Sequence, residues 1–272
     1  MTVADATAPK LRVDSASKAY TTATGDLLAL DRCSLDVFPN EIISVVGPSG
    51  CGKTTLLWSM SGLHGLTSGA IFLDGRPITG PHPDIGIVFQ EANLLPWRDL
   101  DANIHFPFEI KGTEPDRGWI DHLLERVGLE GFGGKMPREL SGGMQQRAAM
   151  VRALALKPSV LLMDEPFGAL DSFTRDEMNH LVEDVWLDRP TTIVFITHSI
   201  EEAIFLSDRV VVLTPRPGRV AETYAVPFPR PRSFDIMATR EVFDLTNAIK
   251  RDIVGGRISV RGKEPAFAEG VT

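Results

Sequence analysis

Short apolar runs alternate with segments of helical spacing along most of this chain. The runs at 160–163 and 192–196 are almost continuously apolar, which is typical of central strands in a parallel sheet. A helix is expected between them, because apolar residues recur there at helical spacing: Met178, Leu181, Val182 and Val185. Further strands are expected at 11–19, 35–38, 41–46, 70–73, 85–89, 209–213 and 220–226, and further helices at 53–61 and 200–206. The alternation predicts an α/β protein with a mostly parallel sheet covered on both faces, preceded by an N-terminal antiparallel β part.

The section from about 91 to 157 has a different pattern, which is helical. One apolar stripe consists of Ile120, Leu123, Leu124 and Val127, and Pro115 suits the first turn of that helix. A second stripe consists of Met144, Ala148, Val151 and Ala155. We interpret this section as a helical subdomain inserted into the α/β core.

The remaining segments divide the chain into one domain and two ends. Residues 1–10 are expected to be disordered, and residues 11–230 form the single domain. Residues 231–272 form a C-terminal extension with one helix through Val242, Leu245 and Ile249.

Composition excludes some function classes. The 272 residues carry a net charge of −8 from 28 basic and 36 acidic side chains, which argues against a broad basic face for nucleic acid. The two cysteines form no disulfide framework and favour a reducing, cytosolic setting. We find no secretory signal and no apolar run near the roughly 18 residues that span a bilayer. A role at a membrane would therefore need a second chain.

The sequence GPSGCGKT at 47–54 matches G-x-x-x-x-G-K-[ST], the loop whose backbone N–H groups cradle nucleotide phosphates. An apolar strand precedes it and a helix follows, which is the setting that the motif requires. Lys53 is expected at the β- and γ-phosphates, and the Thr54 hydroxyl at Mg²⁺. The expected phosphate-binding residues are Gly47, Pro48, Ser49, Gly50, Cys51, Gly52, Lys53, Thr54 and Thr55. On this stretch alone, a glycine-rich turn before a helix remains the alternative.

Two carboxylates follow the apolar strand at 160–163. Asp164 is placed to complete the Mg²⁺ site, although a lone Asp there could also be a strand-terminal cap. In an extended chain Glu165 would point away from Asp164, toward a water that needs a polarising base. Glu165 is therefore the candidate base, in preference to a solvated surface residue.

Ser141, Gly142 and Gly143 precede the helix that begins near Met144. A hydroxyl and free N–H groups at a helix N-terminus can bind an anion, or can simply cap the helix. One nucleotide seldom needs two such loops from one chain, so this segment is expected to serve the nucleotide of a partner.

Together these motifs resemble the nucleotide-binding subunit of an ATP-binding cassette (ABC) transporter, from about Leu11 to Arg219. The family's signature motif corresponds to LSGGMQ at 140–145, its Walker B strand to 160–165 and its D-loop to 169–171. In the same family Gln90 matches the Q-loop glutamine, His198 the switch histidine and Tyr20 the aromatic that stacks on adenine. The resemblance implies a P-loop NTPase core.

The resemblance also implies roles for these residues. The expected catalytic residues are Lys53, Gln90, Glu165 and His198, and the expected Mg²⁺ ligands are Thr54, Gln90 and Asp164. Beyond the phosphate loop, the nucleotide-binding residues are expected to be Tyr20, Gln90, Ser141, Gly142, Gly143, Gln145 and Asp164. Two ATP molecules would lie in a head-to-tail homodimer, each between one phosphate loop and the other subunit's signature motif.

The segment Asn93-Leu94-Leu95-Pro96-Trp97 is apolar and aromatic where exposure is expected. It is either a folded-in loop anchor or a groove for a helix of a membrane-embedded permease subunit. The segment resembles importers of the nitrate/sulfonate/taurine class, as does 197–203. This implies a peripheral ATPase on the cytoplasmic face of the inner membrane, linked indirectly to a solute-binding protein, with no nucleic-acid partner.

The rival classes explain less of the sequence. A GTPase would carry an N-K-x-D motif, which is missing, and a small-molecule kinase would not explain LSGGMQ. A soluble cassette ATPase that acts on nucleic acid or ribosomes is the strongest alternative.

Overall fold

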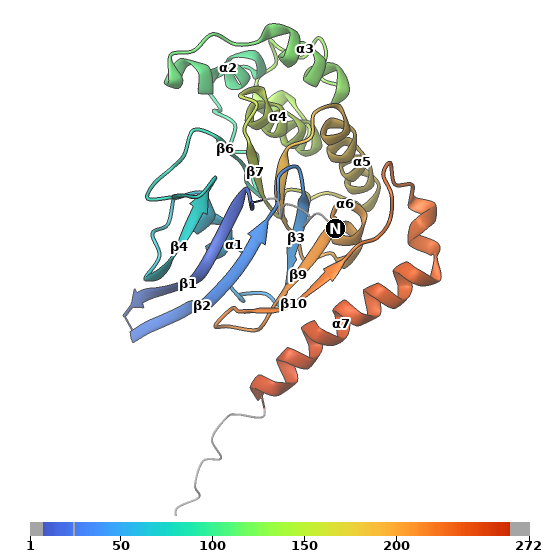
Figure 1. The fold of residues 1–272 in the computed structure, drawn as a ribbon. Coiled ribbons are helices and arrows are strands. Elements are labelled where there is room, and N and C mark those ends of the chain that lie inside the picture. Colours follow the sequence, from blue (N-terminus) through green and yellow to red (C-terminus); the bar gives the residue numbers. More distant parts are fainter. Residues whose placement is uncertain (1–7, 24, 262–272) are drawn as a thin grey trace, which may run out of the picture.

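The computed structural model describes residues 8–23 and 25–261 and contains two sheets (Figure 1). The first is antiparallel with strand order β2-β1-β4-β5, built from β1 (Leu11–Thr22), β2 (Gly25–Val37), β4 (Ser68–Leu73) and β5 (Arg76–Pro77). The second has the order β10-β9-β3-β8-β7-β6 and is parallel except for its edge strand β10. The predicted α/β class is confirmed.

The six-stranded sheet is buried on both faces along its central strands, as their apolar runs predicted, whereas its edge strand β10 is partly exposed. It consists of β3 (Ile42–Val46), β6 (Ile85–Val88), β7 (Val160–Asp164), β8 (Thr192–Ile196), β9 (Arg209–Leu213) and β10 (Val220–Ala225). Alternate residues point to opposite sides. Leu161 and Phe195 join a core shared with the helical lobe, while Leu162 and Val194 join a core shared with α1 and the antiparallel sheet.

The helices lie around this sheet. The helix α1 (Lys53–Met60) follows β3, α5 (Ser172–Asp188) follows β7 and α6 (Ile200–Leu206) follows β8. At one end of the molecule a helical lobe gathers α2 (Leu100–Lys111), α3 (Arg117–Arg126) and α4 (Gly142–Ala155), with a 3₁₀ turn at Pro137–Glu139 (Figure 1).

Three local predictions need correction. The strand expected at 35–38 is only the end of β2, whose outer part is exposed and whose pairing with β1 shifts register near Ala16 and Lys18. Helix α2 was missed, because Pro107 lies inside it; the Asp99 side chain caps its start and Gly112, with φ 63°, ends it. Pro115 lies outside the first turn of α3, because Asp116 is the N-cap and the helix begins at Arg117.

The N-terminal boundary is only partly described. Residues 1–7 of the expected disordered end lie outside the described residues. Lys10 is tied to β2 and to the turn after β4: its backbone N–H donates to the Val37 carbonyl at 2.8 Å, and its Nζ lies 2.7 Å from Asp74 Oδ2.

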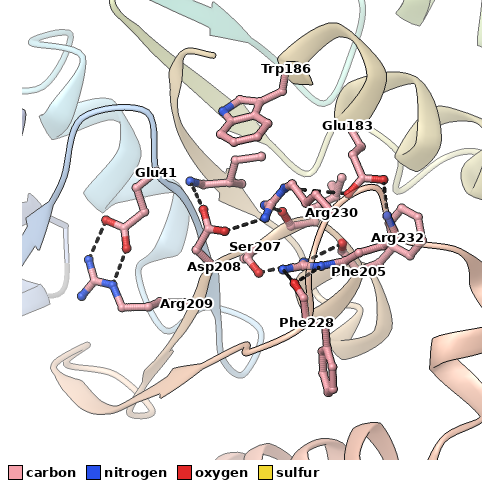
Figure 2. Close-up of polar contacts among 12 residues, drawn as sticks. Glu41, Glu183, Trp186, Phe205, Ser207, Asp208, Arg209, Phe228, Arg230 and Arg232 are labelled. Carbon is pink, nitrogen blue, oxygen red and sulfur yellow. Dashed lines mark hydrogen bonds and ion pairs between the residues drawn. The ribbon is translucent and has the colours of Figure 1, made fainter. Parts of the chain in front are cut away.

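The chain after β10 continues through residues 227–232, which we call the C-terminal strap; its Arg230 and Arg232 point toward Asp208 and Ser207 (Figure 2). Arg232 is 3% exposed and donates to the carbonyls of Ile204, Phe205 and Ser207 at the end of α6. Arg230 Nη1 donates to Asp208 Oδ1 at 2.5 Å, and its guanidinium lies 4.8 Å from the centroid of the Trp186 ring.

Beyond the strap, a 3₁₀ turn at Phe234–Ala238 leads into α7 (Arg240–Arg261), which runs past β9 and β10 (Figure 1). Val242 and Ile249 bury their side chains against the sheet edge. In the part of the chain that the structure describes, no helix has the length and apolar character needed to cross a bilayer.

Candidate nucleotide-binding site

The phosphate loop lies between β3 and α1, at the carboxyl end of the parallel sheet. Gly50 and Gly52 have φ values of 73° and 105°, in the left-handed region that favours glycine. A side chain at Gly52 would also lie 2.9 Å from the Ala29 carbonyl oxygen. Lys53, 7% exposed, folds back over the loop, and its Nζ donates to the Gly47 carbonyl at 3.1 Å.

The loop borders a cavity of about 320 Å³. Its lining includes Tyr20, Glu165, residues of β2 and six residues of the loop: Ser49, Gly50, Gly52, Lys53, Thr54 and Thr55.

 Five of these loop residues are uncharged, and Lys53 is the sixth and carries the charge. The Tyr20 hydroxyl is fixed beside the loop, 2.9 Å from His64 Nδ1 and 3.5 Å from Thr55 Oγ1. The structure therefore brings Tyr20, Glu165 and the phosphate loop around one space.

Asp164 ends β7 next to the start of α1. The Thr54 hydroxyl donates to Asp164 Oδ1 at 3.1 Å. Burial raises the pKa of the Asp164 carboxyl, and the hydrogen bond from Thr54 opposes that shift. Two adjacent oxygen-bearing groups, one of them a carboxylate, fit the oxygen preference of Mg²⁺. No hydrogen bond between described residues joins Gln90, the third expected ligand, to this pair.

The sequence had suggested an extended chain at Glu165, but this residue does not continue strand β7. Its φ is 43°, in the left-handed region, because the chain turns here: Glu165 donates its N–H to the Ile196 carbonyl and accepts from Gly168. The turn places Oε1 3.8 Å from Lys53 Nζ and Oε2 3.3 Å from His198 Nδ1. A non-glycine residue in this region is strained, and such strain is concentrated at functional sites.

Two other expected site residues, Gln90 and His198, lie beside Gly168. A methyl group there would lie 3.6 Å from His198 Cε1 and 3.7 Å from Gln90 Nε2. His198 follows β8 and precedes α6, and its side chain is 56% exposed. Gln90 and His198 therefore lie around the turn that carries Glu165.

The signature segment lies apart from the cavity within this chain. Ser141 caps α4 by accepting from the Met144 N–H at 3.3 Å, and Gly143 packs against Thr174 at the start of α5. Gln145 was expected to bind nucleotide, but its amide donates to the carbonyls of Pro137 and Leu140. None of the residues 141–145 lines the cavity.

Sequence reasoning missed two residues near the site. Gln146, 5% exposed, donates from Nε2 to the Phe89 carbonyl at 2.9 Å, and so joins the signature helix to the segment that ends at Gln90. A polar residue on the buried side of a helix was the available signal. Arg216 lines the cavity although no motif includes it.

Comparisons with known proteins agree with this geometry. A family model described as ABC transporter matches residues 30–168. The taurine import ATP-binding protein TauB of Roseobacter denitrificans is 47% identical over 80% of this chain and 82% of its own length. The nitrate import ATP-binding protein NrtD of Synechococcus elongatus is 44% identical over 82% of this chain and 83% of its own.

Solved structures give the same result. A dimeric ATP-binding cassette in a post-hydrolysis state with ADP and Pi is 29% identical, with a TM-score of 0.71 over 80% of this chain and all of its own. CbiO1 of Clostridium perfringens, part of the ABC transporter complex CbiONQ, is 26% identical, with a TM-score of 0.72 over 93% of this chain and 99% of its own. Because the family model spans half of the sequence and the taurine-import relative is 47% identical over four-fifths of this chain, the chain belongs to the ABC transporter family, as an ATP-hydrolysing subunit.

Proposed function

We propose that this subunit powers the import of a small solute of the nitrate, sulfonate or taurine type. Relatives named for taurine and nitrate import share 47% and 44% of their aligned residues with it. The observation that carries the catalytic part of the proposal is the position of Glu165, whose carboxylate lies between Lys53 and His198 at the edge of the cavity.

In this proposal Glu165 is the base that accepts a proton from the attacking water. Lys53 neutralises charge on the β- and γ-phosphates, and the N–H groups of Gly50 to Thr55 hold the phosphate oxygens. His198 and Gln90 are assigned to the γ-phosphate side, because both lie against the turn at Gly168. Tyr20 is assigned to the adenine.

Thr54 and Asp164 would hold Mg²⁺, since their oxygens are adjacent and ordinary Mg²⁺ ligands. The ion supplies charge neutralisation to the phosphates when bound. Gln90 is kept as a ligand of the assembled site only, because it does not reach the other two in this chain.

We propose a head-to-tail homodimer as the working unit. Ser141, Gly142 and Gly143 leave N–H groups at the start of α4 but do not border the cavity of their own chain. In a head-to-tail pair they would face the γ-phosphate that is bound to the other subunit's phosphate loop. A solved relative of this fold is a dimeric cassette with ADP and Pi.

The 93–97 segment is proposed as the contact for the permease subunits. Leu95 is clamped by Asn103 of α2: the Leu95 N–H donates to Asn103 Oδ1 at 2.7 Å, and Asn103 Nδ2 donates to the Leu95 carbonyl at 3.1 Å. Trp97 is 72% exposed beside this clamp. Exposed aromatics on a fixed backbone are suited to anchoring a partner. The subunit would then lie on the cytoplasmic face of the inner membrane, with a solute-binding protein reached through the permease.

Glu165→Gln tests the catalytic assignment. The substitution keeps the shape and removes the base, so ATP binding should persist while ATP turnover falls by about a hundredfold or more. With ATP, the variant should also accumulate as an ATP-bound dimer, and light scattering of the purified subunit measures its mass. Glu201→Gln, the same change at an exposed position on α6, is the control and should turn over normally. Near-normal turnover in Glu165→Gln would contradict the role of Glu165.

A further inference from the structure

The β9–β10 hairpin is held in one shape at its tip. Residues 214–219 form this hairpin tip, and the Thr214 N–H donates to the Arg219 carbonyl at 2.9 Å. The Thr214 hydroxyl donates to the Pro217 carbonyl at 3.1 Å. The position of Arg216, which lies between these bonds, is therefore fixed by its neighbours.

Gly218 holds the hairpin tip against the phosphate loop. A methyl group at Gly218 would lie 2.1 Å from the Cys51 carbonyl oxygen, a distance that no side chain could accept, so the two backbones are in direct contact. The Gly218 N–H donates to the Ala29 carbonyl at 2.8 Å, and its carbonyl accepts from the Asp31 N–H at 3.0 Å. The hairpin tip, β2 and the phosphate loop thus form one unit.

Arg216 lies on the cavity side of this unit. It lines the same cavity as Tyr20, Ser49 and Lys53, and its side chain is exposed. Among the side chains that the structure describes, none forms a hydrogen bond or ion pair with it. Its neighbour Arg219 instead points to Asp31, with 2.9 Å between Arg219 Nε and Asp31 Oδ2. The hairpin therefore presents one paired and one unpaired guanidinium.

The charges around the cavity favour a negatively charged ligand beside the Arg216 guanidinium. Lys53 is the other cation in the lining, and Glu165 lies 3.8 Å from it. A nucleotide brings several negative charges into this space. A guanidinium offers donors in a fork that matches phosphate oxygens, and its flat face stacks on aromatic rings.

We propose that Arg216 is a nucleotide-binding residue, and that it contacts the nucleoside and α-phosphate end of ATP. The hairpin tip is hydrogen-bonded to β2 at Ala29 and Asp31, and β2 pairs with β1 at Tyr20 through Leu27. The γ-phosphate end is assigned to Glu165 and His198. This inference rests on the proposed nucleotide site and adds to it a residue from a segment outside the cassette motifs.

Calorimetric titration of the purified wild-type chain and of Arg216→Ala with Mg²⁺–ADP and with a non-hydrolysable Mg²⁺–ATP analogue tests the proposal. Loss of one charge-assisted contact should lower the binding affinity for both nucleotides by about tenfold and to the same extent. Arg216→Lys, which keeps the charge, should lose less. The control is Arg76→Ala, which removes an exposed arginine of β5 outside the cavity and should bind like the wild type.

Unchanged affinity of Arg216→Ala for both nucleotides would overturn the proposal, and so would a loss confined to the ATP analogue, which would move the contact to the γ-phosphate. Thermal melting of each variant without nucleotide separates a binding defect from a folding defect. If the wild-type chain itself binds neither nucleotide, the proposed site fails and this inference with it.

Discussion

The two thiols of this protein lie in the packing that supports the phosphate loop. Cys33 and Cys51 are 0% and 1% exposed. Burial raises the pKa of Cys33 to about 11. Burial also raises the pKa of Cys51, although Lys53 opposes that shift. A raised pKa leaves less thiolate at a given pH, so both side chains behave as small packed groups and not as nucleophiles.

We expect neither thiol to react readily with a thiol reagent such as DTNB at pH 8 while the chain is folded. At that pH the thiolate fraction is about one in a thousand for a pKa of 11, against about a quarter for an ordinary cysteine. In denaturant both cysteines of the sequence should react. Rapid reaction of a thiol in the native protein would show that the loop opens more easily than its packing suggests.

At the residue scale, sequence reasoning indicated which residues lie at the cavity better than it predicted their backbone conformation. The phosphate-loop motif indicated Lys53 and Thr54, and both line the cavity. The left-handed turn at Glu165 could not be predicted, because it depends on a hydrogen bond to β8 and on Gly168. Arg216 was missed for a similar reason: contacts of Gly218 with Cys51 and Ala29, which are distant in the sequence, bring it to the cavity.

At the element scale, the buried strands were the most predictable parts and the exposed or interrupted elements the least. Strands β7 and β8 are buried along their whole length, so an apolar run identifies them. Most of the outer half of β2 is exposed, and it therefore leaves no such run. Helix α2 buries Leu100, Ile104 and Phe108, but Pro107 obscures the pattern.

The 93–97 segment gives an element-scale prediction. Trp97→Ala should reduce co-purification with the permease and transport by about tenfold, as truncation of an interface anchor does, while the ATPase activity of the isolated subunit survives. Phe243→Ala, at a 64% exposed position on α7, is the control. Loss of ATP binding by the isolated Trp97→Ala subunit would instead point to a role in folding.

At the scale of the whole molecule, the phosphate-loop cavity and the signature segment lie apart within one chain. The cavity gathers residues from β1, β2, the phosphate loop and the β9–β10 hairpin, while the signature segment starts α4 in the helical lobe. If the dimer is head-to-tail, each complete site takes its phosphate loop from one chain and its signature segment from the other.

Mixing two inactive variants tests this arrangement. Lys53→Ala removes the phosphate-loop charge, and Ser141→Arg blocks the signature segment, so each should be inactive alone. A mixed dimer would contain one site with both parts intact, and equal mixing should restore about a quarter of the wild-type sites. ATP turnover of the mixture is the measurement. No recovery, with mixed dimers demonstrated by differently tagged chains, would contradict a shared site.

The C-terminal strap belongs to the interior of the folded domain. The recognisable motifs stop before β10, yet Arg232 supplies donors to three carbonyls that terminate α6, and α6 is the helix that begins directly after His198. Arg230 likewise balances Asp208 in the turn before β9. A fragment trimmed to its motifs would thus lose part of its own interior, because Arg232 holds the end of the helix that follows His198. The segment that carries the motifs is therefore shorter than the segment that folds as one domain.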